Sequence, residues 1–428
     1  MEMMYQYLWR MKMLGSQEFM LKDGRKVIIV RNGVLNRNSG PDFFNAQISI
    51  EGEEWAGDIE LHERASDWFR HGHHTDPAYD AVILHVVAYD DADIYRTDGT
   101  LIPQLIISLP PGFHSLYETL SKPGSDIRCR NYLRYLPVIA TTDWLETLAV
   151  QRLQQKSARI SDEMSETNND WEQVCFMTLA RGLGFGLNGE PFEMLARSLP
   201  LNILHHHSNS VFQIEALLFG QAGMLDSSCH IFDEYYQALC REYYFLARKY
   251  RLRPLRLNWK YSRTRPQNFP HRRIAMLANA CQGGFALLRR IIESKGDPEK
   301  LEQLFAWRLE GYWAEHFSFD AEARFAPCSL SHKMRETLMI NVCAPLLYTY
   351  GARRGETVYT EMALDLLSDL APEKNSVTRM WEMLDMNADN ALRSQALLQL
   401  KREYCERSRC LECRFGKRII KGGVMAAY

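Results

Sequence analysis

The chain has 428 residues, of which 46% are hydrophobic and 24% are charged, a composition typical of a soluble globular protein. This composition excludes collagen-like, low-complexity and disulfide-rich classes, and the length favours two or three domains. The formal net charge of −2 does not by itself indicate any partner.

The first 15 residues predict a short amphipathic helix. Glu2, Arg10 and Lys12 interrupt the apolar stretch, and no small-residue cleavage site follows, so the segment does not resemble a signal peptide. No later stretch reaches the roughly 20 apolar residues that a membrane span needs. We therefore expect a soluble cytoplasmic protein that has no membrane partner.

Five short segments of the first 110 residues have the composition of strands, with β-branched residues and apolar alternation. They cover residues 27–30, 46–50, 55–62, 82–88 and 101–109. Residues 67–79, between the third and fourth of these, form either a helix or a long loop. The predicted order is therefore helix, three strands, an optional helix and two strands.

From about residue 140 onward, apolar residues recur at helical spacing. The predicted helices span residues 144–160, 169–183, 211–223, 230–249, 272–294, 333–350 and 388–405. Asp143 is the predicted N-cap of the first helix, and Gly351 is expected to end the helix that reaches residue 350. The sequence thus predicts an α+β protein, with a mixed α/β domain over residues 1–115 and a larger all-α region over residues 116–428.

Acidic residues gather on two successive predicted strands. Asp42 lies in a turn at the start of one strand, and Asp58, Glu60 and His62 share one face of the next. Carboxylates held together repel one another, and a divalent cation such as Mg²⁺ or Mn²⁺ relieves that repulsion. We expect Asp42 and Glu60 to bind such a metal, with Asp58 as an alternative ligand. In the other interpretation, Asp42 is a turn residue and Glu60 and His62 lie on a solvated strand face.

These residues resemble a known motif. Pro41-Asp42, followed by 17 residues and then Glu60-x-His62, is similar to the PD-(D/E)xK motif of restriction-endonuclease-like nucleases, whose α-β-β-β-α-β core also resembles the predicted order. The resemblance implies that Asp42 and Glu60 bind the catalytic metal. It also implies that His62 takes the place of a lysine that orients or activates the attacking water. Histidine titrates near neutrality and is a weaker fixed charge than lysine.

Strand alternation places a condition on this site. In a regular strand, Asp42 lies on the same side as the apolar residues Ala46, Ile48 and Ile50. Asp42 can face Glu60 only if the chain kinks near Phe43.

A histidine-rich segment follows the second strand of the motif. It contains His71, His73 and His74 and is followed by Asp76. Zinc would need three or four such ligands to converge. The segment is either a polar loop capped by Asp76 or a loop that flanks the Asp42/Glu60 site and contacts substrate. His85 lies within an apolar strand and is expected to be a core histidine.

Charge is distributed unevenly along the chain. Residues 1–140 contain 19 acidic and 14 basic residues, whereas residues 243–292 contain no Asp or Glu and 12 Lys or Arg. Aromatic residues alternate with the basic ones, a pattern that favours contact with phosphates and unpaired bases of DNA or RNA. In the alternative, the basic residues pair with acidic helices elsewhere. The predicted nucleic-acid-binding residues are Arg251, Arg253, Arg256, Lys260, Arg263, Arg265, Arg272 and Arg273.

Three cysteines near the C-terminus, Cys405, Cys410 and Cys413, have C-x4-C-x2-C spacing. In a reduced compartment this spacing indicates an iron–sulfur cluster or a zinc ion before it indicates a disulfide. A fourth ligand would have to come from far along the chain, and the candidates are Cys129, Cys328 and Cys343. The alternative is a reduced group that packs the final helical turn.

Over nearly its full length the sequence resembles an uncharacterised bacterial family of unknown function. The residues that carry this resemblance are GDIELH (57–62), SDW (66–68), VILHVV (82–87), RPQNFPHRRIA (265–275) and YCERSRCLEC (404–413). No nucleophile elbow, Walker loop or dinucleotide fingerprint appears. Three functions remain open: a metal-dependent nuclease, a non-catalytic nucleic-acid-binding protein, and a helical interaction scaffold whose charges are structural.

Overall fold

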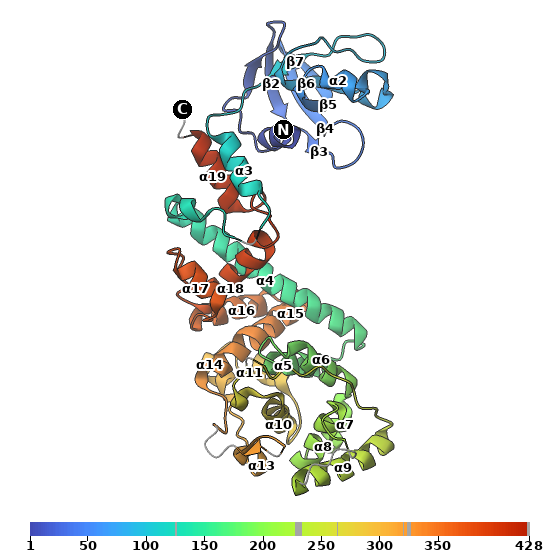
Figure 1. Ribbon diagram of the computed structural model, residues 1–428, viewed down its shortest axis with the longest axis vertical. Helices are drawn as coiled ribbons and strands as arrows, with labels where there is room; N and C mark the ends of the chain where they lie inside the picture. Colours follow the sequence, from blue (N-terminus) through green and yellow to red (C-terminus); the bar gives the residue numbers. More distant parts are fainter. Residues whose placement is uncertain (125, 227–232, 263, 320, 323–326, 426–428) are drawn as a thin grey trace. The chain divides into compact units, whose positions relative to one another are not determined.

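Residues 1–124, 126–226, 233–262, 264–319, 321–322 and 327–425 are described by a computed structural model (Figure 1). The chain divides into two compact units. Unit 1 contains Met1–Thr141 together with Arg402–Tyr428, and unit 2 contains Thr142–Lys401. The predicted α+β class, with a larger helical region, is confirmed.

The division differs from the predicted boundary at residue 115. Helix α3 (Phe113–Ser121) packs against the C-terminal helix α19 (Arg414–Met425), and both belong to unit 1 (Figure 1). Sequence periodicity identifies each helix but does not show which distant helix it packs against. The two ends of the chain therefore build one unit.

A mixed sheet forms the centre of unit 1, with the order β1-β2-β4-β5-β6-β7 and β3 paired to β4. Strands β5, β6 and β7 pair in parallel, and the other pairs are antiparallel. All five predicted strands are present. The two that sequence analysis missed have only three and two residues, too few to show a period. The strands are β1 (Glu18–Met20), β2 (Lys26–Arg31), β3 (Val34–Leu35), β4 (Phe43–Ile50), β5 (Glu53–Arg64), β6 (Val82–Tyr89) and β7 (Gln104–Ile106).

Two helices pack against β5. The predicted N-terminal helix is α1 (Glu2–Arg10), which buries Leu8 and Trp9 completely, and the short α2 (Asp67–Arg70) follows β5 directly. Trp68 of α2 belongs to a small buried cluster that also contains Tyr79, Val82, Ile94 and Ile102. The remaining short helices of unit 1 are η1 (His73–Thr75), η2 (Pro77–Tyr79) and η3 (Arg130–Tyr135).

A bulge in β4 satisfies the condition on Asp42. Asn45 adopts a left-handed backbone conformation with φ of 55°, and the β4–β5 register shifts between Phe43 and Ala46. Phe43 and Ala46 are both fully buried although they are three residues apart. Because Phe43 points into this core, Asp42 points to the opposite face of the sheet, which is also the face of Glu60.

Unit 2 is helical around one large apolar core. Its helices are α4 (Val138–Glu166, which starts in unit 1), α5 (Trp171–Leu183), α6 (Gly189–Ser198), α7 (Leu201–His206), α8 (Val211–Gln221), α9 (Glu234–Tyr250), α10 (Pro270–Cys281), α11 (Leu287–Glu293), α12 (Pro298–Gln303), α13 (Tyr312–Glu315), α14 (His332–Leu338), α15 (Ala344–Arg354), α16 (Thr357–Asp369), α17 (Ser376–Glu382) and α18 (Ala391–Gln399). Smaller elements are the 3-10 helix η4 (Pro266–Asn268), the π-helices η5 (Met339–Cys343) and η6 (Leu400–Cys405, which crosses the boundary between the units), and the hairpin of β8 (His316–Ser318) and β9 (Ala321–Glu322).

Several predicted helix limits are wrong. Helix α4 starts at Val138, so Asp143 lies inside it and is not an N-cap. Helix α15 passes through Gly351 and ends at Gly355, whose φ of 69° suits a helix C-cap. The predicted helix over residues 272–294 is two helices, because Gly283 and Gly284 both have positive φ.

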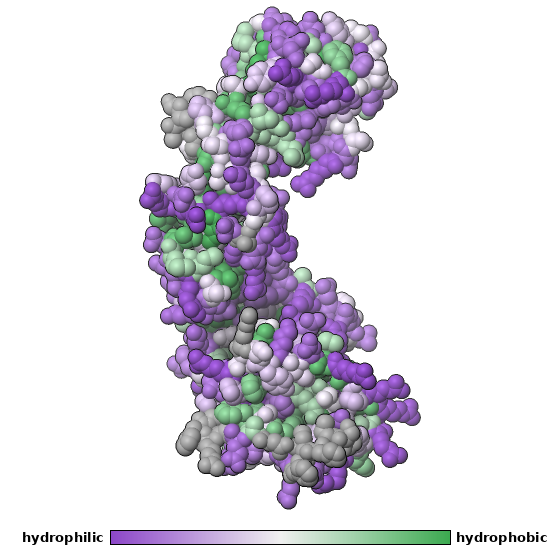
Figure 2. Space-filling view, viewed as in Figure 1, coloured by the Kyte–Doolittle hydropathy of each residue, from purple (hydrophilic) through white to green (hydrophobic). Residues whose placement is uncertain are grey.

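The visible surface of both units is mostly hydrophilic (Figure 2), in keeping with the buried apolar cores. Within the described ranges, no helix is both long and apolar enough to cross a bilayer.

Candidate functional site

Asp42 and Glu60 are held together by a reciprocal pair of backbone hydrogen bonds. The amide of Asp42 donates to Glu60 Oε2 over 2.8 Å, and the amide of Leu61 donates to Asp42 Oδ2 over 3.1 Å. Each carboxylate therefore lies beside the strand that carries the other. The structure brings these two predicted site residues together.

Neither carboxylate has a cationic Lys or Arg partner among the described ion pairs. The pKa of Asp42 is raised to about 7, mainly by burial and secondly by the charge of Glu60. Burial also raises the pKa of Glu60 to about 8, and the charge of Glu2 adds to this effect. Burial and repulsion both oppose ionisation, so a bound cation would relieve both acids.

The N-terminal helix contributes two residues that sequence analysis did not assign to the site. Gln6 Nε2 donates to Asp42 Oδ1 over 2.6 Å, and Glu2 Oε1 lies 3.8 Å from His62 Nε2. Glu2 and Gln6 are four residues apart and share one face of α1. This polar pair on an otherwise apolar helix was the available sequence signal.

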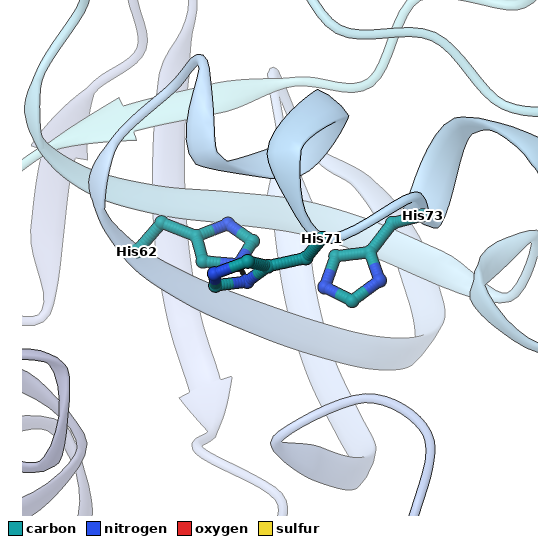
Figure 3. A group of neighbouring side chains, drawn as sticks. All are labelled: His62, His71 and His73. Carbon is teal, nitrogen blue, oxygen red and sulfur yellow. Dashed lines mark hydrogen bonds between the residues drawn. The ribbon is translucent and has the colours of Figure 1, made fainter.

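Three imidazoles complete the site (Figure 3). His62 extends from β5, and His71 and His73 approach it from the segment after α2. His62 Nε2 lies 3.1 Å from His71 Nδ1 and 3.5 Å from Glu60 Oε1, and His73 Nε2 lies 3.3 Å from the same Glu60 oxygen. The interpretation that the histidine segment flanks the carboxylates agrees with this arrangement.

His85 lies behind His62. His85 is completely buried, and its Nε2 lies 2.8 Å from His62 Nδ1, so it is the core histidine that the sequence predicted. Burial lowers the pKa of His62 to about 2 and that of His85 to about 3. At neutral pH His62 is therefore uncharged. It offers a nitrogen lone pair instead of the fixed positive charge of a lysine.

Potential ligand atoms fall into two overlapping groups. One group is His62, His71 and His73, and the other is Glu2, Glu60 and His62; within each group the atoms lie within 4.8 Å of one another. The predicted ligands Asp42 and Asp58 belong to neither group. Asp58 Oδ1 accepts a hydrogen bond of 3.1 Å from the amide of Asn45 at the bulge. The expected oxygen-only set thus becomes a mixed set of imidazoles and carboxylates.

The histidine loop is also capped as predicted. Asp76 accepts a hydrogen bond of 2.9 Å from the amide of Ala78 and starts η2. The ring of His74 packs against Phe69 and lies outside both ligand groups. The two interpretations of this loop are therefore compatible, and its contact with a substrate stays a prediction.

A cavity of about 690 Å³ opens at the other end of α1. Its lining includes Arg10, Lys12 and Arg31, and also Asn45 of the bulge. The three basic side chains form no ion pair with any described residue. The cavity therefore presents uncompensated positive charge in unit 1.

Two of the predicted nucleic-acid-binding arginines are internal. Arg272 is completely buried and donates to the carbonyl oxygens of Trp313, His316 and Pro327. Arg273 is 2% exposed, and its guanidinium donates to Asn268. Their assignment to a nucleic-acid surface is wrong, because both side chains are used to satisfy internal acceptors.

The other basic residues behave differently. Over residues 251–260, which have no regular secondary structure, exposed and half-buried side chains alternate. We call this segment the basic strap. Its backbone is fixed by Gln221, which accepts from the amide of Leu255, and by Asn188, which hydrogen-bonds both to the amide and to the carbonyl of Lys260.

The charges of the strap point outward. Arg251, Arg253, Arg256 and Lys260 are exposed and form no ion pair with the described residues, and the same holds for Arg265 just beyond the strap. Arg263 lies outside the described residues. The alternative that these particular residues pair with acidic helices therefore finds no support.

The predicted cofactor ligands Cys405, Cys410 and Cys413 are all buried in unit 1. The pKa of Cys129 is raised mainly by burial and secondly by the charges of these three cysteines. Of the three candidates for a fourth ligand, Cys129 is the one that lies beside the group. Cys328 and Cys343 belong to unit 2.

A family model described as a protein of unknown function (DUF2851) matches residues 2–376. We call Glu2, Gln6, Asp42, Glu60, His62, His71 and His73 the carboxylate–histidine site. The match includes every residue of this site and of the basic strap, but it ends before the three C-terminal cysteines. Comparison with curated proteins and with solved structures gives no match.

Proposed function

The chain belongs to the DUF2851 family of unknown function, and from the geometry of unit 1 we propose that it is a divalent-metal-dependent phosphodiesterase that cleaves nucleic acid. The observation that carries the proposal is the convergence of Glu60 with neutral imidazoles and a second acid, Asp42. Among the residues that the structure describes, no Lys or Arg supplies a counter-charge there. The resemblance to PD-(D/E)xK nucleases supports metal-dependent hydrolysis at Asp42 and Glu60, but the roles we propose differ from those it implies: His62 is a ligand and Asp42 is a proton acceptor.

The ligands that we propose are Glu60, His62 and His73. Glu60 Oε1 lies 3.5 Å and 3.3 Å from the nearest nitrogens of the two histidines, so one ion could contact all three after small movements. Imidazole ligands favour Zn²⁺ or Fe²⁺ over Mg²⁺. His71 is exposed and Glu2 is half-buried, so these two residues line the side from which an ion enters.

A divalent ion at this position supplies a Lewis acid and lowers the pKa of bound water. The protein's own residues orient the metal ligands and accept protons. His62 donates its Nδ1 hydrogen to His85 when its Nε2 is a ligand, an arrangement that fixes the ring. Asp42, whose amide donates to Glu60, lies close enough to the proposed ligands to accept the proton that water would release.

Nucleic acid is the proposed substrate because basic residues lie near the site. Glu2 and Arg10 belong to the same helix, eight residues or about 12 Å apart along its axis. The cavity lined by Arg10, Lys12 and Arg31 can therefore bind phosphates that flank the cleaved one.

The test is hydrolysis of labelled single-stranded DNA and RNA by the full-length protein with Mn²⁺, Zn²⁺ or Mg²⁺. We expect Glu60→Gln to lower kcat/KM by about 100-fold, because a metal ligand is lost. Asp58→Asn is the matched control: it removes the same charge from the same strand, outside both ligand groups, and should retain activity within about twofold. Equal activity of wild type and Glu60→Gln would contradict the proposal.

A second candidate function is nucleic-acid binding without cleavage. The exposed and unpaired cations of the basic strap favour it, since these side chains can reach phosphates without breaking any described ion pair. Binding that persists in a chain without detectable hydrolysis would support this candidate.

A further inference from the structure

Four cysteines from separate segments of unit 1 come together: Cys129 lies within electrostatic range of the other three, and its neighbour Arg128 is hydrogen-bonded to Cys410. Cys405 ends η6, Cys410 and Cys413 lie in the turn before α19, and Cys129 directly precedes η3. All four are only 5% to 8% exposed. Such a group of buried thiols, drawn from both ends of the chain, is outside the carboxylate–histidine site.

Arg128 fixes the position of Cys129. Its Nη1 donates to Cys410 Sγ over 3.2 Å, and its Nη2 donates to Ser408 Oγ over 2.8 Å. Because Arg128 is the immediate neighbour of Cys129, these bonds hold Cys129 against the turn that carries Cys410 and Cys413. The guanidinium also places a positive charge beside sulfur atoms that would be thiolates when bound to metal.

The turn is built tightly. A Cβ on Gly416 would lie 2.0 Å from the carbonyl oxygen of Cys410, so only glycine allows the first turn of α19 to approach it this closely. Tyr7 of α1 donates to the carbonyl oxygen of Leu411 over 3.4 Å. The positions of the cysteines are therefore defined by packing on several sides.

The spacing of the sulfurs distinguishes between two kinds of metal site. With Zn–S bonds of about 2.3 Å, a tetrahedral zinc ion needs sulfurs about 3.8 Å apart. Among the described residues, the groups of three ligand atoms within 4.8 Å of one another include no cysteine. In a cluster of several irons, different irons bind different thiolates, and the sulfurs stand farther apart.

We propose that Cys129, Cys405, Cys410 and Cys413 ligate an iron–sulfur cluster and that Arg128 donates an N–H···S hydrogen bond to one of its ligands. This site does not depend on the proposed hydrolysis. A chain that lacks nuclease activity would still contain the cluster.

The test starts with the full-length wild-type protein purified without oxygen. We expect about two to four irons per chain with a matching amount of acid-labile sulfide, together with visible charge-transfer absorption. Zinc in place of iron, or neither metal after reconstitution with iron and sulfide, would overturn the assignment. This measurement decides the question whether or not any variant folds.

Variants then identify the ligands. Cys129→Ser and Cys410→Ser should each lose most of the iron, whereas Cys328→Ser, in unit 2, should retain it. A Cys129→Ser protein with wild-type iron content and spectrum would overturn the choice of Cys129. Arg128→Met should keep the iron but shift the reduction potential, because the side chain can no longer donate a hydrogen bond to sulfur, and an unchanged potential would exclude that role.

Discussion

Glu60 is a strand residue that would ordinarily be solvated, yet it is only 4% exposed. Its carboxylate is surrounded by neutral imidazoles and by the amide of Asp42, none of which carries a full positive charge. An acid in such surroundings stays protonated near neutral pH or pairs with a cation. The chemistry of the site therefore depends on whether a metal ion is present.

A pH dependence of stability follows from the two acids. Their pKa values of about 7 and 8 in the folded chain exceed the ordinary values of 3.8 and 4.5, so above pH 4 the folded state binds more protons than the unfolded state. Its free energy of unfolding therefore falls as pH rises. His62 and His85, whose pKa values are lowered, oppose this only below pH 6.5, where the unfolded histidines become charged.

We therefore expect the metal-free protein to lose about 2 kcal/mol of stability in unit 1 between pH 6.5 and pH 8. Chemical denaturation at a series of pH values measures this loss. The double variant Asp42→Asn/Glu60→Gln should show little change over the same window. A slope that the double variant retains would show that other groups cause it. Added Mn²⁺ should reverse the sign, because it favours the ionised carboxylates.

At the scale of elements, one bulge decides whether the two acids meet. The extra residue at Asn45 shifts β4 by one position, so that Asp42 faces Glu60 while Ala46, Ile48 and Ile50 remain in the core. Asparagine tolerates the left-handed conformation better than most residues do, and Asp58 accepts a hydrogen bond from its amide. The bulge thus connects local backbone chemistry to the site.

Asn45→Val should therefore lower the free energy of unfolding by about 1–2 kcal/mol, because a β-branched residue is strained at positive φ. It should also weaken Mn²⁺ binding, measured by calorimetry, because Asp42 would move. Asn45→Gly is the control and should keep both properties, since glycine adopts this conformation freely. A fully stable Asn45→Val protein with unchanged metal affinity would rule out this role for the bulge.

At the scale of the whole molecule, each unit carries its own chemical features. Unit 1 contains the carboxylate–histidine site, the cavity lined by Arg10, Lys12 and Arg31, and the four cysteines. It is built from segments at both ends of the chain. Unit 2 contains the basic strap on a separate apolar core. Substitutions on the surface of one unit should therefore leave the other unit folded.

The strap makes a distinct prediction for binding. Arg253→Gln/Arg256→Gln should weaken binding of a labelled single-stranded oligonucleotide by about tenfold and lower the salt slope by about 1.4, as expected when two phosphate contacts are lost. Fluorescence anisotropy at several salt concentrations measures both quantities. Arg289→Gln/Arg290→Gln removes the same charge from the same acid-free window, but Arg289 is paired with Glu293. Equal losses in the two double variants would indicate a nonspecific charge effect.

The features that sequence analysis predicted correctly are local ones. Strand alternation, helical periodicity and the acid-free window depend on residues that are close in sequence, and they established the α+β class and the five main strands. The pairing of Asp42 with Glu60 was also accessible, because a short turn separates their strands. Helix limits at Asp143 and Gly351 were wrong because packing extends helices beyond local capping signals.

The sequence by itself determined the residue types available for chemistry: paired acids, a histidine-rich loop, a basic segment and grouped cysteines. Only the tertiary structure decided which of them meet. It brought Glu2 and Gln6 to the acids, placed Cys129 beside the C-terminal thiols, and buried Arg272 and Arg273 among internal hydrogen-bond acceptors. The physical reason is that periodicity and capping act over a few residues, whereas ligand sets and desolvation depend on segments that only packing of the whole unit brings together.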